Sequence, residues 1–410
     1  MAKVFHSLIT SIDIGTTKIS VLIAQKVSED QVEILGVGKS PSHGLDKGVV
    51  VDIAKTVQSI KQAVQEAELM AGCSVNSAYI GISGSHIQSF NAQGAVPIKR
   101  AQVQQSDIEA VLAAAKAVPV EEGQKILHTL PQYFIVDGKD RVTNPLGLHG
   151  VRLEAMVHVI TGSVASMQNL VKCCEMAGVI VKDIVLEQLA SAAGVLSHDE
   201  LALGVGVLDI GGGTSDFAVY QDGSIRYTKV LPIAGNHFTK DLAVGLHATL
   251  HDAERIKQQF GNVIEAFDET EEELEIESVH GSVVHKVPKQ KLQYILHARA
   301  LELCKYLEND IHRSALLPMM TAGLVITGGG SLLQGLDQLA QSVLSFPVRT
   351  GGPRAEYKLL DTLESPVFAT GYGLIQYALQ QNKQYALERM EGPMAKRILM
   401  KMRSWVDKFF

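Results

Sequence analysis

The stretch Ser11-Ile-Asp-Ile-Gly-Thr-Thr-Lys-Ile-Ser-Val-Leu-Ile23 decides the fold, because a variant of it returns in the second half of the chain. The second copy is Val207-Leu-Asp-Ile-Gly-Gly-Gly-Thr-Ser-Asp-Phe-Ala-Val-Tyr220. Each copy has an apolar β-branched run, a turn of Gly and Thr, and a second apolar run, which predicts two strands joined by a tight turn. A polar turn and a third predicted strand follow each copy, at 32–37 and 225–231. The sequence therefore predicts an internal duplication.

Helical patterns follow both copies. Apolar residues recur mostly every three or four positions from Ile53 to Met70, which predicts a helix. The stretch from Phe238 to Phe260 is also helical by pattern. An α/β chain with two homologous halves around a cleft is the simplest architecture for this order of elements.

Three segments interrupt the symmetry. The stretch Ser83–Gly162 is an insertion with mixed strand and helix signals, including a predicted helix over 106–118. The acidic stretch Asp268–Glu277 is interpreted as a solvated excursion. The polar stretch Gln380–Pro393 ends in Gly-Pro and is interpreted as a flexible linker.

Composition excludes several classes of function. The 410 residues are 46% hydrophobic and 20% charged, which is enough for two or three domains with sizeable cores. The formal net charge of -7 argues against nucleic-acid binding, which needs clustered Lys and Arg. We find no signal peptide and no window of about 18 apolar residues that could span a bilayer. We therefore expect a cytosolic protein.

Two turns carry the features of a phosphate site. They are Asp13-Ile-Gly-Thr-Thr-Lys18 and Asp209-Ile-Gly-Gly-Gly-Thr214, where backbone N–H groups and Thr hydroxyls suit phosphate oxygens. A strand follows each turn, so neither is a Rossmann fingerprint or a Walker loop, both of which precede a helix. We expect the two turns to clamp one phosphate tail, with Asp13 and Asp209 holding Mg²⁺ largely through water. A plain glycine turn is the alternative interpretation of either motif alone.

A third glycine cluster lies near the end of the chain. The stretch Val325-Ile-Thr-Gly-Gly-Gly-Ser331 follows an apolar run and precedes a predicted helix over 332–344. Its bare backbone could lie against a nucleoside without obstruction by side chains. By itself this motif is weak, because three glycines before a helix are common.

The three motifs in this order resemble the superfamily of actin, heat-shock chaperones and sugar kinases over roughly residues 8–380. The resemblance implies an actin-like ATPase fold of two ribonuclease-H-like halves around a nucleotide cleft, with ATP and Mg²⁺ as ligands. Leu186–Val195 resembles the first hinge helix of that superfamily and Ala369–Leu374 the second. The residues implied to bind nucleotide are Gly15, Thr16, Thr17, Lys18, Gly211, Gly212, Gly213, Thr214, Gly235, Glu254, Lys257, Gly328, Gly329, Gly330 and Ser331.

The same resemblance bears on catalysis. It puts Asp13 and Asp209 beside the phosphates and Glu187 where the attacking water is oriented. A plain carboxylate at a helix start is the alternative for Glu187. Without a clear general base, we expect at most slow Mg²⁺-dependent hydrolysis, with ATP acting as a structural and switching ligand.

The insertion selects one family within the superfamily. Its segments His128-Thr-Leu-Pro-Gln-Tyr-Phe-Ile-Val-Asp-Gly138, Asn144–Glu154 and Val157–Gly162 resemble the inserted subdomain of the bacterial FtsA family. That family implies a head-to-tail filament, contacts of the insertion with the next protomer and with later division proteins, and a place at midcell on the cytoplasmic face of the inner membrane. The implied limits are 1–83, 164–200 and 367–380 for the first half, 84–163 for the insertion, 201–238 and 312–366 for the second half, 239–311 for an outer subdomain, 381–393 for a linker and 394–410 for a terminal helix.

The FtsA family also binds the C-terminal peptide of FtsZ on the outer subdomain. Arg299 and Glu302 lie there one predicted helical turn apart, and they are our candidates for polar contacts to that peptide. An ordinary surface ion pair at i,i+3 spacing is the alternative interpretation.

The last segment, 394–410, reads as an amphipathic helix. One face carries apolar side chains and the other carries bases, five in all against one acid. Such a helix lies in the interface of an anionic membrane, and it does not cross the membrane, because cations do not cross hydrocarbon cheaply. Docking on its own domain or on a partner is the alternative. The candidate membrane residues are Ile398, Leu399, Met402, Trp405, Phe409, Lys396, Arg397, Lys401 and Arg403.

Three other classes share the core pattern. A metabolic sugar or acid kinase predicts substrate-dependent turnover, and it leaves the basic terminal segment without a role. A chaperone of this superfamily needs a peptide-binding domain beyond the ATPase core. A pilus-assembly or MreB-like relative is cytoskeletal too, and only the amino-acid sequence of the insertion argues against it.

Overall fold

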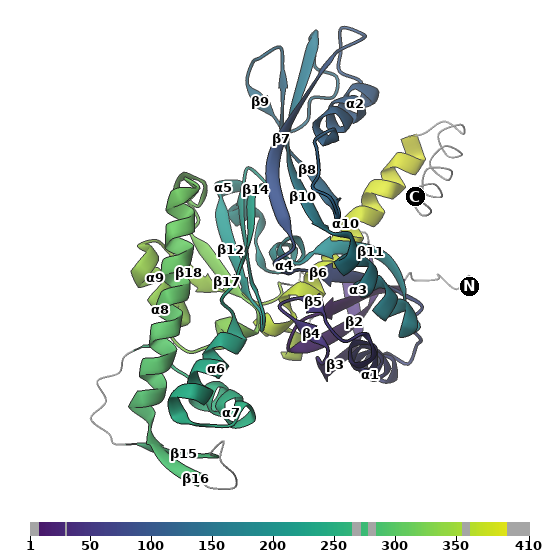
Figure 1. Cartoon of the computed structure of the whole chain (residues 1–410). Helices are drawn as coiled ribbons and strands as arrows, with labels where there is room; N and C mark the ends of the chain where they lie inside the picture. Colours follow the sequence, from purple (N-terminus) through teal and green to yellow (C-terminus); the bar gives the residue numbers. More distant parts are fainter. Residues whose placement is uncertain (1–7, 29–30, 265–271, 278–283, 355–360, 392–410) are drawn as a thin grey trace.

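The computed structural model describes residues 8–28, 31–264, 272–277, 284–354 and 361–391 (Figure 1). The predicted membrane helix 394–410 lies outside these described residues. Within them, no helix is both long enough and apolar enough to cross a bilayer.

Two five-stranded sheets with the same topology form the body of the molecule. In each, three antiparallel strands are followed by two parallel strands toward the other edge. The duplication predicted from the repeated motif is therefore confirmed. The first sheet contains, in spatial order, β3 (Val32–Pro41), β2 (Lys18–Lys26), β1 (Leu8–Ile14), β6 (Ser77–Ile82) and β11 (Ile180–Leu186). The second contains β14 (Ser224–Leu231), β13 (Ser215–Gln221), β12 (Val205–Ile210), β17 (Leu324–Thr327) and β18 (Val348–Thr350).

Helix α1 (Ile53–Ala71) covers one face of the first sheet, as the apolar spacing predicts. Its N-cap, Asp52, accepts a hydrogen bond from the Lys55 N–H, and Gly72 ends it in the left-handed region. The helix packs closely on β3, because a Cβ at Gly38 would overlap the carbonyl of Ala63. Helix α3 (Val164–Met176) packs beside α1 over the same apolar cluster.

The second half differs from the predicted helices at two places. The helical stretch predicted over 238–260 is two helices, α6 (Gly235–Leu246) and α7 (Leu250–Phe260). The break occurs because His247 takes a left-handed conformation and Thr249 caps the second helix. The helix predicted over 332–344 starts later: a 3₁₀ turn, η2 (Gly329–Leu332), precedes α9 (Leu336–Leu344), and Gly335 at φ 79° separates them.

The acidic stretch was interpreted as a solvated excursion, and this is wrong where the structure describes it. Residues Glu273–Glu277 form strand β15, which pairs with β16 (Val284–Pro288). Leu274 and Ile276 are buried and alternate with exposed glutamates, which is the pattern of a half-buried strand. The hairpin leads into the long helix α8 (Lys289–Arg313).

The insertion forms a separate sheet that projects from the body (Figure 1). We call this unit the insert. It has its own apolar cluster, centred on residues such as Val111, Leu153 and Val157. Its elements are β7 (Gln88–Pro97), β8 (Gln124–Val136), β9 (Arg141–Val142), β10 (Arg152–Ser163) and α2 (Gln105–Lys116), which confirms the helix predicted over 106–118 within two residues.

The prediction of a flexible linker over 380–393 is wrong for residues 380–391, because these residues are helical. Helix α10 begins at Ala369 and continues to Glu391. From residue 380 to residue 391 the sequence is rich in Gln, Glu, Ala and Leu and has no Gly or Pro, so helix propensity outweighs polarity. The limits proposed for the subdomains stay predictions.

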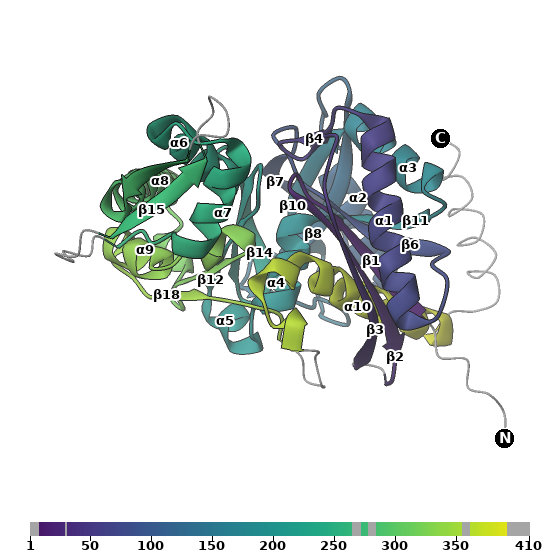
Figure 2. The ribbon, with the colours of Figure 1, turned by 90° about the horizontal axis from the view of Figure 1, so that it is seen from below.

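Helices α4 (Glu187–Val195) and α10 lie between the two halves, as Figure 2 shows from below. The remaining elements are short: α5 (His198–Leu203), β4 (Leu45–Asp46), β5 (Val49–Val50), η1 (Leu317–Met319), η3 (Asp361–Leu363) and η4 (Pro366–Phe368).

Candidate functional site

The two glycine turns face each other across the junction of the halves. Each closes in the same way, with the first Gly N–H donating to a carbonyl three residues on at 3.0 Å, Gly15 to Lys18 and Gly211 to Thr214. A Cβ at Gly212 would overlap the Thr17 side chain, and one at Gly213 would lie 2.5 Å from Thr16 Oγ1. Only glycine permits this approach, so the two turns lie against each other, and their role in binding phosphate stays a prediction.

Asp13 and Asp209 end the strands that lead into these turns, and both are buried. Asp13 pairs with Lys18 at 2.7 Å and accepts a hydrogen bond from Ser20 at 3.3 Å. Asp209 accepts hydrogen bonds from Thr370 at 2.8 Å and from Ser191. Both hydroxyls come from the predicted hinge helices, so the hinge is bonded directly to the second phosphate turn.

A third buried aspartate, Asp216, belongs to the site and was missed by the sequence analysis. It accepts hydrogen bonds from Ser83 at 2.5 Å, from Gln188 at 2.7 Å and from Thr214 at 3.3 Å. Ser83 lies in the first half and Asp216 in the second, so the bond crosses the cleft. A signal was available, because Asp216 is a lone acid inside the apolar strand β13.

Glu187 is the first residue of α4 and completes a cluster of four carboxyl groups. Burial raises its pKa well above the ordinary value, and the charges of Asp13, Asp216 and Asp209 raise it further. Burial also raises the pKa of Asp209, and it raises the pKa of Asp216 to about 7. These shifts mean that the protein alone does not fully compensate the negative charge, which is the environment that a bound cation relieves.

The cluster does not form a direct metal cage. Among the residues that the structure describes, no three His, Cys, Asp or Glu side chains are placed to ligate one ion. Buried carboxylates beside two glycine turns fit a hydrated Mg²⁺ better than a tightly coordinated metal.

The candidates beside the nucleoside lie on α6 and α7. Lys257 Nζ donates to the carbonyl of Gly235 at 3.1 Å and pairs with Glu254 at 2.7 Å, and Thr239 joins both side chains. The Gly235 N–H donates to the carbonyl of Gly211 at 2.9 Å. This predicted group is therefore connected directly to the second phosphate turn.

The three glycines of the third motif have different roles. Gly328, at φ 79°, lies against Asp209, where a Cβ would overlap the carboxylate. Gly330 packs against Ile210 in the same way, whereas a Cβ at Gly329 would meet only Val367, at 3.9 Å. Gly329 thus has open space beside it. Ser331 is buried and donates to the Gly328 carbonyl at 2.8 Å, so it stabilises the turn.

The hinge helices cross in close contact. A Cβ at Gly373 of α10 would overlap the carbonyl of Ala190, and one at Gly194 of α4 would lie 2.5 Å from the carbonyl of Ala369. Both predicted hinge segments are therefore helical and touch through glycine. The two helices form one unit at the back of the site.

Arg299 and Glu302 lie on α8, well away from the carboxyl cluster in sequence and fold. Arg299 forms an ion pair with Glu302 and a two-pronged pair with Asp241, whose Oδ1 lies 2.9 Å from Nη2. The surface ion pair that the sequence left as an alternative is thus present, and Asp241 is an additional partner.

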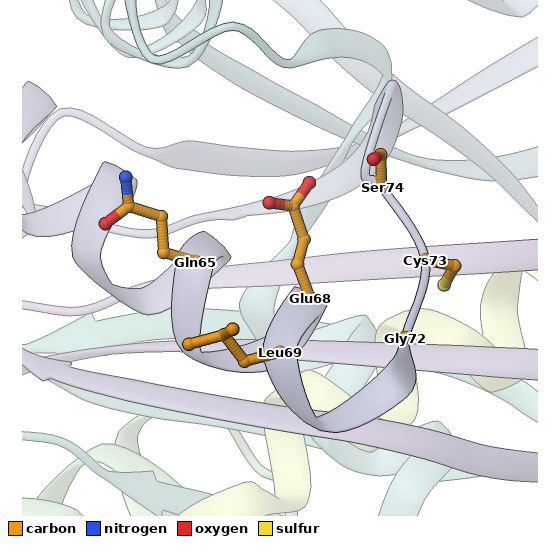
Figure 3. A pocket seen from close by; sticks show the side chains of 6 residues that line it. All are labelled: Gln65, Glu68, Leu69, Gly72, Cys73 and Ser74. Carbon is orange, nitrogen blue, oxygen red and sulfur yellow. The ribbon is translucent and has the colours of Figure 1, made fainter.

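A surface hollow of about 440 Å³ lies at the C-terminal end of α1 (Figure 3). It is lined by Gln65, Glu68, Leu69, Gly72, Cys73 and Ser74. Its one carboxylate, that of Glu68, accepts a hydrogen bond from the Val75 N–H at 2.6 Å and so stabilises the end of the helix. None of the residues predicted to bind nucleotide lines this hollow.

Comparison with solved structures identifies the fold. The chain resembles the PilM-PilN type IV pilus biogenesis complex with a TM-score of 0.65 at 16% identity, covering 90% of this chain and 98% of that one. It resembles MreB5 of Spiroplasma citri bound to ADP with a TM-score of 0.54 at 15% identity, covering 94% and 99%. At these identities the likeness shows the fold alone, and the predicted actin-like ATPase fold is confirmed.

Comparison of sequences identifies the family. A family model described as cell division protein FtsA matches residues 207–373, and one described as the SHS2 domain inserted in FtsA matches residues 84–161. The chain is 40% identical to cell division protein FtsA of Pseudomonas aeruginosa over 413 residues, covering 98% of both chains. It is 36% identical to that of Escherichia coli K12 over 410 residues, covering 98% of this chain and 96% of the relative. The chain therefore belongs to the FtsA family of cell division proteins.

Proposed function

We propose that the chain is a peripheral division protein that binds Mg²⁺-ATP between its halves, polymerises head to tail, and connects the C-terminal peptide of FtsZ to the cytoplasmic face of the inner membrane at midcell. In this role it helps to recruit later division proteins through the insert. The observation that carries the nucleotide part is the convergence of two glycine turns on four carboxyl groups at the junction of the halves.

The phosphate tail would lie between the two turns, within reach of their backbone N–H groups and of Thr16, Thr17 and Thr214. Asp13 and Asp209 would hold Mg²⁺ through water, and the ion would neutralise phosphate charge. The open backbone at Gly329 and the pair of Glu254 and Lys257 would border the nucleoside.

Glu187 is our candidate for orienting the attacking water. Its raised pKa means that it accepts a proton more readily than an ordinary carboxylate. Burial and the neighbouring acids favour its protonated form, which cannot accept a proton, so we expect hydrolysis to be slow.

Calorimetric titration of the full chain with ATP in Mg²⁺ tests the site. We expect wild type and Glu187→Gln to bind ATP with affinities within about threefold of each other, since glutamine keeps the shape of the side chain. We expect single-turnover hydrolysis by Glu187→Gln to be about a hundredfold slower. Absence of ATP binding by the wild type would refute the nucleotide proposal.

The membrane proposal depends on the segment 394–410. Since α10 runs to Glu391, a chain that ends there leaves the described helix complete, whereas a cut at Gln380 would remove its last turns. Liposomes with anionic lipid should co-sediment the full chain but not the chain ending at Glu391. Trp405→Glu, which keeps every base, should also reduce binding. If truncation leaves sedimentation unchanged, this segment is not the anchor.

The anchor of one molecule is modest, because ordering a helix costs conformational entropy that offsets much of the gain from burial. A filament that presents many copies binds by avidity. We therefore expect ATP-dependent polymerisation to increase liposome binding, and measurements with and without ATP test this link.

The proposal for the FtsZ peptide rests on α8, where Arg299 is partly exposed beside Glu302. Arg299→Ala should weaken binding of a synthetic FtsZ C-terminal peptide about tenfold. Arg255→Ala is the matched control, because Arg255 forms an i,i+3 ion pair with Asp252 on the neighbouring helix α7. Equal effects of the two variants would argue against a specific peptide contact.

A further inference from the structure

One strand of the insert contacts both the hinge and the second half. Along β8, His128 Nε2 accepts a hydrogen bond from the Leu186 N–H at 3.1 Å. Two residues later, Leu130 packs against the apolar cluster that joins α4 to the second sheet. Two residues further, Gln132 Nε2 donates to the carbonyl of Ile225 in β14 at 2.9 Å. The insert is therefore attached to the start of α4 and to the second half as well as to its parent half.

The hydrogen bond to His128 is made where strand β11 ends and hinge helix α4 begins. Leu186 is the last residue of β11, an edge strand of the first sheet, and the N-cap residue of α4. No side chain caps α4 at this residue. The next residue is Glu187, so the backbone that carries this carboxylate is held from outside by an imidazole of the insert.

The ring of His128 is itself fixed. It packs edge-on against Tyr377 of α10, with the ring centroids 6.3 Å apart. Burial lowers the pKa of His128 to about 4, so the imidazole is neutral at physiological pH and Nε2 keeps its lone pair for the Leu186 N–H. His128 therefore touches both hinge helices, α4 through its backbone and α10 through an aromatic ring.

Glu187 makes two further contacts, one through its carbonyl and one through its side chain. Its carbonyl accepts a hydrogen bond from Ser191 within the same helix at 2.9 Å. Its side chain lies against Gly81 of β6, where a Cβ would be 3.1 Å from Cγ. Leu186 also pairs with Ile82 at the end of β6, so the bond to His128 and the end of the sheet together hold the start of α4. A shift of Leu186 would move Glu187 relative to Asp13 and Asp209, because Glu187 is the next residue of the chain.

We propose that His128 is a positioning residue that couples the orientation of the insert to the placement of Glu187 in the nucleotide cleft. The inference rests on the proposed nucleotide site. A partner that tilts the insert would then change hydrolysis in the cleft, and nucleotide binding would change the exposure of β8. The physical link between the insert and Glu187 consists of strand β8 and the hydrogen bond from the Leu186 N–H to His128.

Two variants of the full chain separate positioning from packing. His128→Gln keeps a hydrogen-bond acceptor at about the reach of Nε2, and His128→Leu removes the acceptor but keeps an apolar body. The matched control is His149→Leu, which removes an exposed imidazole of the insert that contacts Gln102 and not the hinge.

Three measurements are made on each protein: ATP affinity in Mg²⁺, single-turnover hydrolysis, and hydrogen–deuterium exchange of peptides covering 124–136 and 180–190. We expect His128→Leu to hydrolyse ATP about tenfold more slowly with affinity within about threefold of wild type. Its 180–190 peptide should exchange faster, and ATP should no longer alter exchange in β8. His128→Gln should restore most of each property, and His149→Leu should keep the rate.

The outcomes distinguish the two proposals. If wild type does not bind ATP, the proposed nucleotide site fails and this inference fails with it. If wild type binds ATP but His128→Leu matches it in rate and in exchange, the inference alone is overturned. It is also overturned if His149→Leu slows hydrolysis equally, or if His128→Gln fails to restore the exchange pattern. Where hydrolysis by every protein is too slow to measure, the ATP-dependent exchange of β8 decides.

Discussion

Four carboxyl groups at one place are the dominant feature at the scale of single residues. Asp13 has Lys18 as a partner, and Asp209 and Asp216 have hydroxyl and amide donors. Glu187 has acids as its main charged neighbours. The folded protein thus carries electrostatic strain here that an Mg²⁺-nucleotide would relieve, so ligand binding and stability should be linked.

The raised pKa of Asp216 should make the free energy of unfolding depend on pH. Its pKa is about 7 in the folded protein against an ordinary 3.8, so between these values the folded state holds a proton that the unfolded state has lost. Its contribution to the free energy of unfolding therefore falls as pH rises from about 4 to 7. We expect Asp216→Asn to gain stability relative to wild type across this range, by up to about 1.4 kcal/mol per pH unit, and to plateau above it.

Urea unfolding of the ligand-free protein at pH 5, 6, 7 and 8 checks this. Asp199→Asn, which removes an exposed acid, is the control for loss of one charge. Parallel curves for wild type and Asp216→Asn would contradict the assignment.

The crossing of α4 and α10 is the decisive contact at the scale of elements. Glycines let the two helices approach until Ser191 and Thr370 both reach Asp209. A helix pair held this tightly acts as a rigid hinge, because interdigitated backbones cannot slide without overlap.

Gly373→Ala should separate these helices. The added Cβ would overlap the carbonyl of Ala190, so we expect a loss of at least about 3 kcal/mol in the free energy of unfolding and weaker ATP binding. Gly371→Ala, on the same helix, is a matched control, since its Cβ would lie 3.4 Å from Leu22 Cδ1. There we expect no loss and a gain of up to about 1 kcal/mol from helix propensity. Thermal and urea unfolding of both variants test this prediction. Equal destabilisation by Gly373→Ala and Gly371→Ala would contradict the close crossing of α4 and α10.

At the scale of the whole molecule, the insert belongs to both halves. It leaves the chain from the first half, yet its inner strands bond to β14 of the second through Ser89, Gln132 and His158. The insert nevertheless has its own apolar core. A separate core with polar attachments favours movement as a unit, which suits a surface for partners and neighbouring protomers.

His158→Leu should loosen this attachment. The imidazole contacts Asn91 Oδ1 at 2.7 Å and Thr228 Oγ1 at 2.9 Å. Leucine would remove this partner from the buried Thr228 hydroxyl, whereas Asn91 is exposed and still accepts a hydrogen bond from Gln132 at 3.1 Å. We expect a cost of about 1–3 kcal/mol and a separate low-temperature transition for the insert in calorimetry. His149→Leu, at an exposed position in the same insert, should leave the thermogram unchanged. A single transition at the wild-type temperature for His158→Leu would show that the contact contributes little.

The sequence by itself determined the duplication, the two facing turns and the helix of residues 53–71. These features are local, because alternation, helical spacing and Gly-rich turns record which face of a segment is buried and where the chain must bend. Residue patterns alone also marked the insertion and its helix over 106–118, whereas the family of the insert and the two hinge helices came from the resemblance.

Only the tertiary structure decided which side chains meet. Asp216 joins the site because Ser83 and Gln188, distant in sequence, converge on it. The bond from Leu186 to His128 likewise joins an edge strand to an inserted one, and no local pattern encodes it. Local periodicity reports burial, whereas the partner of a buried polar group depends on how separate elements pack, and that is fixed only when the whole chain folds.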